Sequence, residues 1–299
     1  MKWQGRRRSS NVEDRRGQRS TGQGIGGFNP ALLGPMLRIL FSKVGLFIVG
    51  AFLLISLMMG KNPLALISQF LSGGTMQTES SAGYKPTAKD EELANFSATI
   101  LANTEDVWNK LLDNYREPTL VLFTGAVESA CGSASSSTGP FYCPGDEKLY
   151  LDLSFFDDME RQLNAPGDFA QAYVIAHEVG HHIQKIMGIS EKVQRLRGQL
   201  SQKEYNKYSV KLELQADFLA GVWAHYSQEM TQMMEAGDLE EALNAANAIG
   251  DDRLQKQSSG RVVPDSFTHG TSEQRMRWFK KGFDTGDLSQ GDTFNATSL

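Results

Sequence analysis

Apolar residues at helical spacing account for most of the chain after residue 89. In DEELANFSATILANTEDVWNKLLDN they recur every three or four positions, which is the spacing of one face of an α-helix. Segments of the same kind continue to about Phe283, among them FAQAYVIAHEVGHHIQKIM and YSVKLELQADFLAGVWAHY. This pattern predicts a mostly helical domain over residues 89–299.

Two short segments have the composition and period of β-strands instead. TLVLFTG is rich in β-branched and aromatic residues, and KLYLDLS alternates leucines with Tyr150 and Asp152. Both lie in one part of an otherwise helical chain, and no internal repeat is visible. The fold class expected is α+β, mostly helical with a small β-sheet.

A third pattern precedes the domain. From Val44 to Met59 the chain reads VGLFIVGAFLLISLMM, sixteen residues without a charge. A spanning helix typically needs about 20 apolar residues, and apolar positions extend this run back toward residue 36. A buried core helix would normally show a polar face, and a cleaved signal peptide would show a small-residue cleavage site. We therefore expect one N-terminal transmembrane helix over residues 36–60.

Charge is distributed unevenly around this apolar run. Up to Lys43, nine Lys and Arg residues against two acidic ones give a local charge of +7, and the rest carries −12. The positive-inside rule places the basic end in the cytoplasm. The arginines could also bind nucleic acid or anionic lipid, but their Gly, Ser and Gln neighbours favour a disordered tail. We expect a cytoplasmic tail over residues 1–35 and no nucleic-acid partner.

The chain beyond the anchor is expected to lie outside the cytoplasm. Residues 61–88 fill with Gly, Ser and Thr, which indicates a linker. Cys131 and Cys143 flank a loop rich in Ser and Gly, and a zinc site would need more ligands at closer spacing. An extracytoplasmic domain therefore favours a disulfide between the two.

The stretch VIAHEVGHHIQ holds three of the five histidines. On a helix, His177 and His181 lie within about 40° of each other, whereas His182 is turned about 140° from His177. The pattern H-E-x-x-H lets two imidazoles hold zinc while Glu178 contacts a zinc-activated water as general base. Core histidines bonded to the backbone are the alternative. The apolar neighbours favour the metal, because these groups would be costly to bury without partners.

A catalytic zinc site needs a third protein ligand. The extended pattern H-E-x-x-H-x-x-G-x-x-H would place a third histidine at position 187. Met187 occupies that position, so this class of site is excluded. Glu191 and Glu204 have local explanations at the starts of helices. Glu213 lies among apolar residues, one turn before Asp217. Glu213 on zinc and Asp217 on the free N–H of a ligand histidine would satisfy both carboxylates, whereas an exposed acidic pair is the alternative.

An oxyanion formed during hydrolysis usually has a further hydrogen-bond donor. His269 is the candidate, because it stands beside Gly270 in a loop just before a helix that Thr271 or Ser272 begins. Arg275, on the first turns of that helix, could assist. An ordinary loop histidine is an equally weighted alternative.

Several longer segments resemble one bacterial family. HEVGHHIQ, LELQADFLAGVWA and GPFYCPGDEKLYLDLSFF are similar to the neutral zinc metallopeptidases of the YpfJ-like group, and the likeness begins at KWQGRRRSSNVEDRRG. The resemblance implies a zincin-like catalytic domain with one zinc ion, Glu178 as base and Glu213 as third ligand. It also implies that the KLYLDLS strand lines the cleft and pairs with an extended substrate.

Residues and resemblance together predict a membrane-anchored zinc metallopeptidase that hydrolyses peptide bonds in peptides or proteins. Its catalytic domain is expected on the periplasmic side of a bacterial inner membrane. The alternative is a catalytically silent zinc-fold module with an interaction or chaperone-like role.

Overall fold

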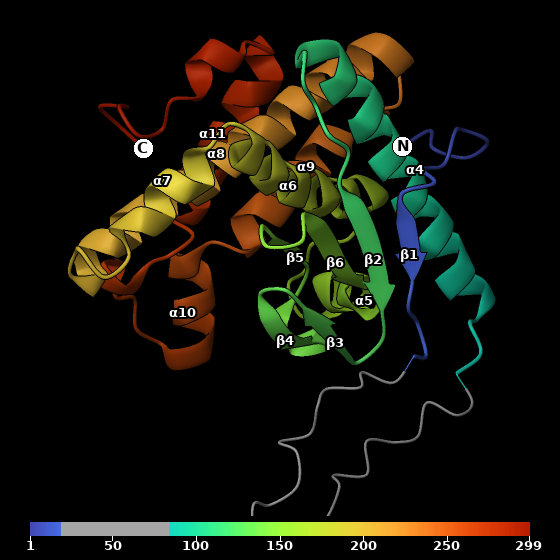
Figure 1. Cartoon of the computed structure of the whole chain (residues 1–299), viewed down its shortest axis with the longest axis horizontal. Helices are drawn as coiled ribbons and strands as arrows, with labels where there is room; N and C mark the ends of the chain where they lie inside the picture. The colour runs from blue at the N-terminus through green and yellow to red at the C-terminus, as the bar shows by residue number, and fades with distance from the viewer. Residues whose placement is uncertain (19–83) are drawn as a thin grey trace, which may run out of the picture. The chain divides into compact units, whose positions relative to one another are not determined.

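The computed structural model of the chain describes residues 1–18 and 84–299 (Figure 1). The helix expected over residues 36–60 and nearly all of the linker expected over residues 61–88 lie outside these ranges. No helix within the two described ranges is long and apolar enough to cross a membrane. Residues 1–18 and 85–299 belong to one folded unit.

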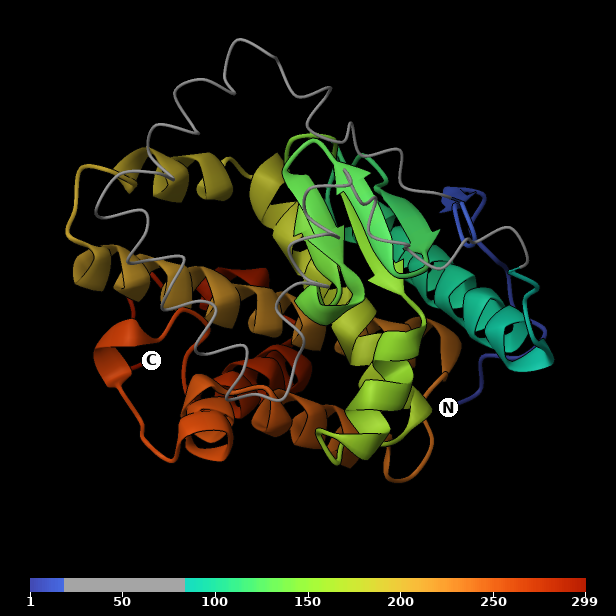
Figure 2. The same cartoon turned by 90° about the horizontal axis from the view of Figure 1, so that it is seen from below.

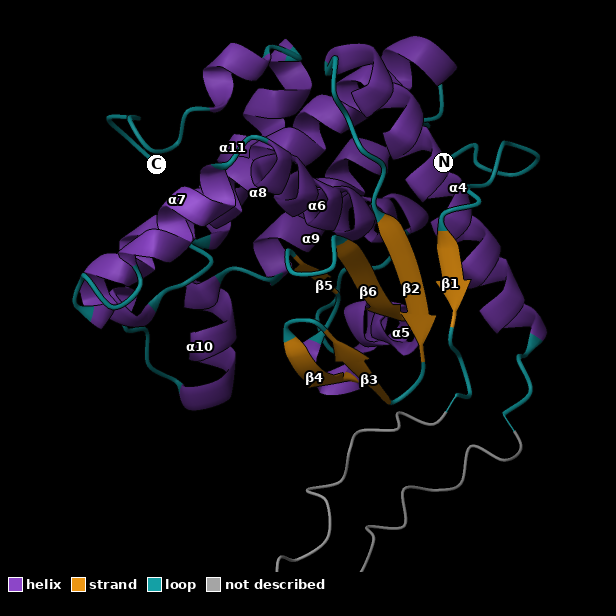
Figure 3. Ribbon diagram, in the orientation of Figure 1, coloured by secondary structure: helices purple, strands orange, loops and turns teal. Residues whose placement is uncertain are grey.

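Helices make up most of this unit (Figure 3). They are α4 (Ala88–Leu111), α5 (Ser154–Arg161), α6 (Asp168–Ile186), α7 (Ile189–Leu196), α8 (Gln202–Thr231), α9 (Asp238–Ala248), α10 (Asp251–Ser259) and α11 (Ser272–Thr285). Capping boxes begin α4, α8 and α11, at Thr87, Ser201 and Thr271. The predicted helix around VIAHEVGHHIQ is confirmed as α6.

A four-stranded sheet lies against the helices. Its strands, in spatial order, are β1 (Val12–Asp14), β2 (Thr119–Phe123), β6 (Lys148–Asp152) and β5 (Phe141–Cys143). The first three are parallel, and β5 runs antiparallel to β6. A separate hairpin is formed by β3 (Ala126–Ser129) and β4 (Gly132–Ser135). The predicted α+β class and the two predicted strands are confirmed.

Side chains along β2 and β6 point alternately to the two faces of the sheet, so the hydrophobic core is divided into two clusters. The leucines of both strands face the helices, while Val121 and Tyr150 face the other way, toward Val127 of the hairpin. The central strands are therefore buried on both faces, although β6 carries a tyrosine and an aspartate in alternation. Figure 2 shows the teal helix α4 running alongside the green strands.

Residues 1–18 are folded onto the domain, so the expectation of a disordered tail is wrong for this part. β1 pairs with β2, with Val12 opposite Leu120. The buried carboxylate of Glu105 in α4 accepts hydrogen bonds from the Ser9 hydroxyl and the Asn11 amide. Pattern analysis missed this strand because it has only three residues, VED, and its partner is more than 100 residues away in the chain.

The arginines of this segment have partners within the same unit. Arg7 pairs with Glu105 at 2.8 Å, and Arg16 pairs with Asp14 at 2.6 Å and with Glu91 at 2.9 Å. Charge patterning predicts a solvated tail here because it does not show which acidic side chains lie close to these arginines in the fold. Arg7 and Arg16 instead attach the segment to α4 through their ion pairs.

This pairing bears on the expected membrane topology. β1 precedes the apolar run of residues 44–59 in the sequence, and β2 follows it. A single crossing within that run would place the two paired strands on opposite sides of the membrane. The pairing and a single-pass arrangement with residues 1–18 inside and the domain outside therefore exclude each other. The side of a membrane on which the unit lies stays a prediction.

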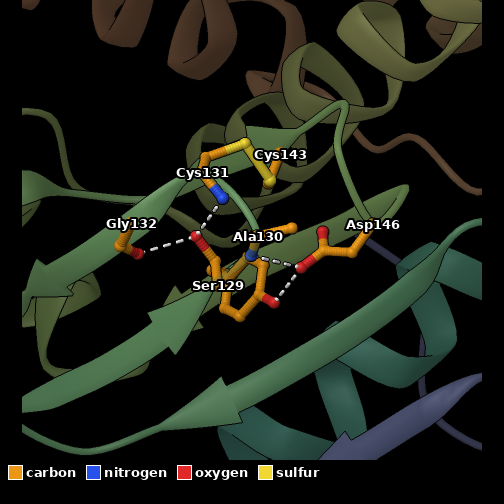
Figure 4. Close-up of a disulfide and its surroundings, with 7 residues drawn as sticks. Ser129, Ala130, Cys131, Gly132, Cys143 and Asp146 are labelled. Carbon is orange, nitrogen blue, oxygen red and sulfur yellow. Dashed lines mark hydrogen bonds between the residues drawn. A yellow bond between two sulfur atoms is a disulfide. The ribbon is translucent and has the colours of Figure 1, made fainter. Parts of the chain in front are cut away.

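The predicted disulfide between Cys131 and Cys143 is confirmed (Figure 4). It joins the tip of the β3–β4 hairpin to the last residue of β5. The Ser129 hydroxyl accepts from the Cys131 amide at 3.1 Å, and the Asp146 carboxylate accepts from the Ala130 amide at 3.0 Å. The hairpin tip is thus fixed to one end of the edge strand.

Candidate metal centre

The candidate metal centre lies where α6 and α8 come close together. A Cβ added at Gly180 would lie 2.9 Å from the carbonyl oxygen of Ala216, closer than real Cβ atoms approach. Glycine at this position therefore lets the two helices meet at the turn that separates His177 from His181.

Three side chains from the two helices converge at this contact. His177 Nε2 lies 3.2 Å from one oxygen of Glu213, and His181 Nε2 lies 3.5 Å from the other. The two imidazole rings are 4.8 Å apart, edge to face. One ligand atom from each of the three residues lies within 4.8 Å of the other two. The structure thus brings together the three residues predicted as metal ligands.

The second nitrogen of each histidine is held by an acceptor. His177 Nδ1 bonds Asp217 at 2.8 Å, and His181 Nδ1 bonds the side-chain oxygen of Gln184 at 2.9 Å. Because these oxygens accept, both Nδ1 atoms carry a proton, and in a neutral ring the Nε2 lone pair is left facing Glu213. This tautomer is the one required for metal binding through Nε2.

Asp217 is fully buried and surrounded by donors. Besides His177 it accepts from the Tyr173 hydroxyl at 2.6 Å and from Arg275 Nε and Nη2 at 2.8 and 2.9 Å. Burial raises the pKa of Asp217, but Arg275 and His177 lower it below its ordinary value, so the carboxylate stays charged. The alternative of an exposed acidic pair is excluded, because Asp217 is inaccessible to solvent.

The electrostatics of the cluster favour a cation. Burial lowers the pKa of His177, but Asp217 and Glu213 raise it further, to about 9. Burial raises the pKa of Glu213, yet His181 and His177 bring it well below its ordinary value. The two imidazoles therefore lie in a field of carboxylates that stabilises positive charge between them.

The donor set fits zinc. Two imidazole nitrogens and one carboxylate oxygen, each histidine fixed by its own acceptor, are the ligands of a catalytic site with an open position. A second acidic group contains Asp168, Asp238 and Glu241. It offers no nitrogen ligand, and Asp168 receives the amino group of Met1 at 3.0 Å. The chemistry of the donors therefore favours the histidine cluster as the zinc site.

Glu178 lies with this cluster in a cleft of about 560 Å³. The cleft walls come from β5 and the turn before it, from α7, from α8, and from the loop that precedes α11. Burial raises the pKa of Glu178 above its ordinary value, although His181 and His177 oppose the shift. A half-buried carboxylate with a raised pKa, beside a cluster that attracts a cation, is suited to accept and return a proton.

His269 also lines this cleft, as its loop position suggested. Its Nδ1 lies 3.3 Å from Asp251, and its side chain is 50% exposed. Asp251 additionally accepts from the backbone amides of Thr268, His269 and Gly270, so it organises the whole loop. The hydrogen bond that Asp251 accepts raises the pKa of His269, although burial lowers it. The role of Asp251 could not be predicted, because it lies 18 residues before His269 in the chain.

Two sequence expectations can be compared with the structure here. Arg275 was expected to assist an oxyanion; its Nε and Nη2 bond Asp217 and its side chain also lines the cleft, so this role stays a prediction. KLYLDLS was expected to pair with substrate, but as β6 it lies between β2 and β5, so both of its edges are occupied. Among the described strands, β5 is the one at the edge of the sheet that lines the cleft.

Two residues of the cluster were missed. Tyr173 precedes His177 by four residues and Gln184 follows His181 by three, so helical spacing alone places both near the ligand face. A polar side chain near the ligand face was the feature by which both could have been predicted as partners of the cluster. Tyr173 bonds Asp217, and Gln184 bonds His181 and the backbone of α8.

Comparison with known proteins identifies the family. The family model described as "Putative neutral zinc metallopeptidase" matches residues 1–294, which include β1 and the whole cluster. An uncharacterized protein of Escherichia coli, YpfJ, is 50% identical over 298 residues, covering 98% of this chain and 99% of its own. An uncharacterized protein of Mycobacterium tuberculosis is 42% identical over 208 residues, covering 66% of this chain and 69% of its own. No solved structure matches. The chain belongs to the family described as "Putative neutral zinc metallopeptidase".

Proposed function

We propose that the chain is a zinc-dependent peptidase with Glu178 as general base and His177, His181 and Glu213 as metal ligands. The observation that carries the proposal is the orientation of the two imidazoles. Each Nδ1 is bonded to the protein, and each Nε2 faces Glu213 in the same cleft as Glu178. A zinc ion held there supplies Lewis acidity that activates water and polarises a carbonyl.

The residues of the cleft divide the remaining work. Glu178 takes a proton from the attacking water and returns it to the leaving nitrogen, so that water is added across the peptide bond. His269, held by Asp251, donates a hydrogen bond to the carbonyl oxygen as negative charge develops on it. Asp217 keeps His177 in the required tautomer, and Arg275 keeps Asp217 charged.

The edge strand suggests how a substrate is held. β5 pairs with β6 on one side, and Phe141 and Tyr142 line the cleft. An extended peptide can add to such an edge through main-chain hydrogen bonds. This supports peptides or unfolded protein segments as substrates. β5, rather than β6, would then be the strand that pairs with the substrate.

A metal and activity assay of the purified full chain tests the proposal. We expect about one zinc ion per chain and hydrolysis of an unfolded protein substrate. A chelator should abolish this activity, and added zinc should restore it. Glu213→Gln should lose zinc, whereas Glu229→Gln, an exposed acid on the same helix, should keep both zinc and activity. Retention of zinc in Glu213→Gln would contradict the ligand assignment. Zinc binding by the wild type without turnover would favour the silent zinc-fold module.

A further inference from the structure

His182 is the histidine of α6 that the metal cluster does not use. Its side chain is fully buried, on the side of α6 that faces β5. The ring packs edge-on against Tyr142, at 5.3 Å between centroids, and Tyr115, at 5.9 Å. A polar ring buried between two aromatic side chains needs hydrogen-bond partners on both nitrogens.

Both nitrogens have a partner. His182 Nε2 lies 2.6 Å from the backbone carbonyl oxygen of Arg116, which can only accept, so Nε2 carries a proton. His182 Nδ1 lies 2.9 Å from the Tyr142 hydroxyl. Hydrogen bonds thus link Tyr142 through His182 to the backbone before β2.

Tyr142 is the middle residue of the edge strand. β5 has three residues and is paired on one side, so its own ladder provides few hydrogen bonds to hold it. Each of its residues has a further attachment. Phe141 stacks on Tyr150 at 4.8 Å, Cys143 forms the disulfide, and the Tyr142 hydroxyl bonds His182.

The same residue lies in the cleft of the proposed base. Tyr142 and Glu178 both line this cleft. The Tyr142 hydroxyl contacts His182, and one helical turn earlier on the same face of α6 lies Glu178, which shares the cleft with Tyr142. Loss of the hydrogen bond between Tyr142 and His182 would therefore let β5 shift in the cleft that it shares with Glu178.

We propose that His182 is a positioning residue for peptide hydrolysis: by holding the Tyr142 hydroxyl, it keeps the edge strand in place in the cleft that contains Glu178. The inference rests on the proposed function of the cleft. His182 touches neither substrate nor metal in this arrangement. It acts through Tyr142, and the variant that isolates its effect is therefore Tyr142→Phe, which removes one hydroxyl and keeps both rings.

Tyr150→Phe is the matched control. Tyr150 lies on the neighbouring strand β6, is buried, and bonds Asp146 through its hydroxyl at 2.7 Å, away from the cleft. Both variants lose one partly buried hydroxyl bond, so we expect a similar fall in Tm, of about 2–4 °C. A purely structural role for His182 predicts that the two variants also behave alike in catalysis.

The positioning role predicts that they differ. Tyr142→Phe should lower kcat about tenfold with zinc affinity unchanged, as expected for a group that acts on the base, and Tyr150→Phe should leave kcat unchanged. His182→Gln keeps a donor for the Arg116 carbonyl and an acceptor for Tyr142, so its kcat should exceed that of His182→Phe. Equal kcat values in the two tyrosine variants would overturn the proposal.

Hydrogen exchange at the Tyr142 amide separates this inference from the proposed function. The amide should exchange faster in Tyr142→Phe than in the wild type or Tyr150→Phe, while the amides of β2 and β6 keep their protection. Unchanged exchange at residue 142 would contradict the positioning role whatever the activity. A zinc-loaded wild type without turnover would overturn the peptidase and with it the catalytic consequence, but faster exchange would still show that the hydroxyl bond holds β5.

Discussion

Asp217 and His177 form the contact on which the geometry of the metal centre depends. Asp217 accepts the Nδ1 proton of His177 at 2.8 Å, and Tyr173 and Arg275 hold the carboxylate in place. His177 Nε2 is thereby turned toward Glu213. The contact joins α6 to α8, and its support by Arg275 brings in α11. Zinc affinity and stability are therefore expected to depend on the same carboxylate.

The first prediction concerns Asp217→Asn. An amide presents a donor to Arg275 and His177 and removes the charge that balances the buried guanidinium, so the free energy of unfolding should fall by about 3–5 kcal/mol. Zinc affinity should fall about 10- to 100-fold. Tyr173→Phe removes one neutral donor, and its cost should be about 1 kcal/mol. Urea unfolding and zinc titration measure both effects. Wild-type zinc affinity in Asp217→Asn would contradict the role of this carboxylate.

A second prediction tests the folded N-terminal segment. The buried Ser9 hydroxyl bonds the Glu105 carboxylate, whereas Ser10 is exposed. Ser9→Ala should lower the free energy of unfolding by about 1–3 kcal/mol, and Ser10→Ala should change it by less than about 0.5 kcal/mol. Urea unfolding of the full chain distinguishes them. A disordered tail would make both substitutions neutral.

The third prediction concerns topology. Because β1 pairs with β2, residue 10 and the end of the domain should lie on the same side of any membrane the chain meets. Cysteines introduced at the exposed positions Ser10 and Ser289 should react alike with a membrane-impermeant maleimide in intact cells, with Cys131 and Cys143 replaced by serine. One reactive and one protected position would restore the single-pass anchor and contradict the strand pairing.

The fourth prediction concerns the disulfide. Cys131 and Cys143 are 12 positions apart, and in the chain-entropy model closing a loop of this length stabilises the fold by about 3 kcal/mol. The double variant Cys131→Ser, Cys143→Ser should therefore unfold at a lower urea concentration than the oxidised wild type. A reductant should bring the wild type to the same midpoint. Identical midpoints for the oxidised wild type and the variant would show that the bond adds no stability.

A fifth prediction follows from the raised pKa of His269. A histidine whose pKa is higher in the folded than in the unfolded state stabilises the fold fully below the unfolded value, near 6.5. The contribution is lost as pH rises through the folded value. The difference in unfolding free energy between the wild type and His269→Gln should therefore be larger at pH 5.5 than at pH 9. A difference that grows with pH would contradict the pairing with Asp251.

The grouping of the candidate ligands could be predicted because helical spacing decides which residues share a helix face. His177 and His181 share a face of one helix, and Glu213 and Asp217 share a face of another. β1 could not be predicted, since VED has no strand pattern and its stability comes from a partner more than 100 residues later. For the same reason the ion pair between Arg275 and Asp217 could not be predicted, because the two residues are 58 positions apart in the chain.

Which strand lies at the edge of the sheet beside the cleft could not be predicted either. KLYLDLS has the clearer strand pattern, and it was therefore chosen as the strand that meets substrate. Sheet order depends on contacts between distant segments, and it places the three-residue strand FYC at the edge instead. The role of His182 was equally invisible, because it needs the position of Tyr142, 40 residues earlier.

The most direct test of the central claim is Glu178→Gln in the purified full chain, with zinc content and peptide hydrolysis measured on the same samples. The account predicts about one zinc ion per chain in both proteins and a loss of kcat of at least about 100-fold in the variant. Full activity in Glu178→Gln, or a wild type that binds no zinc, would contradict it.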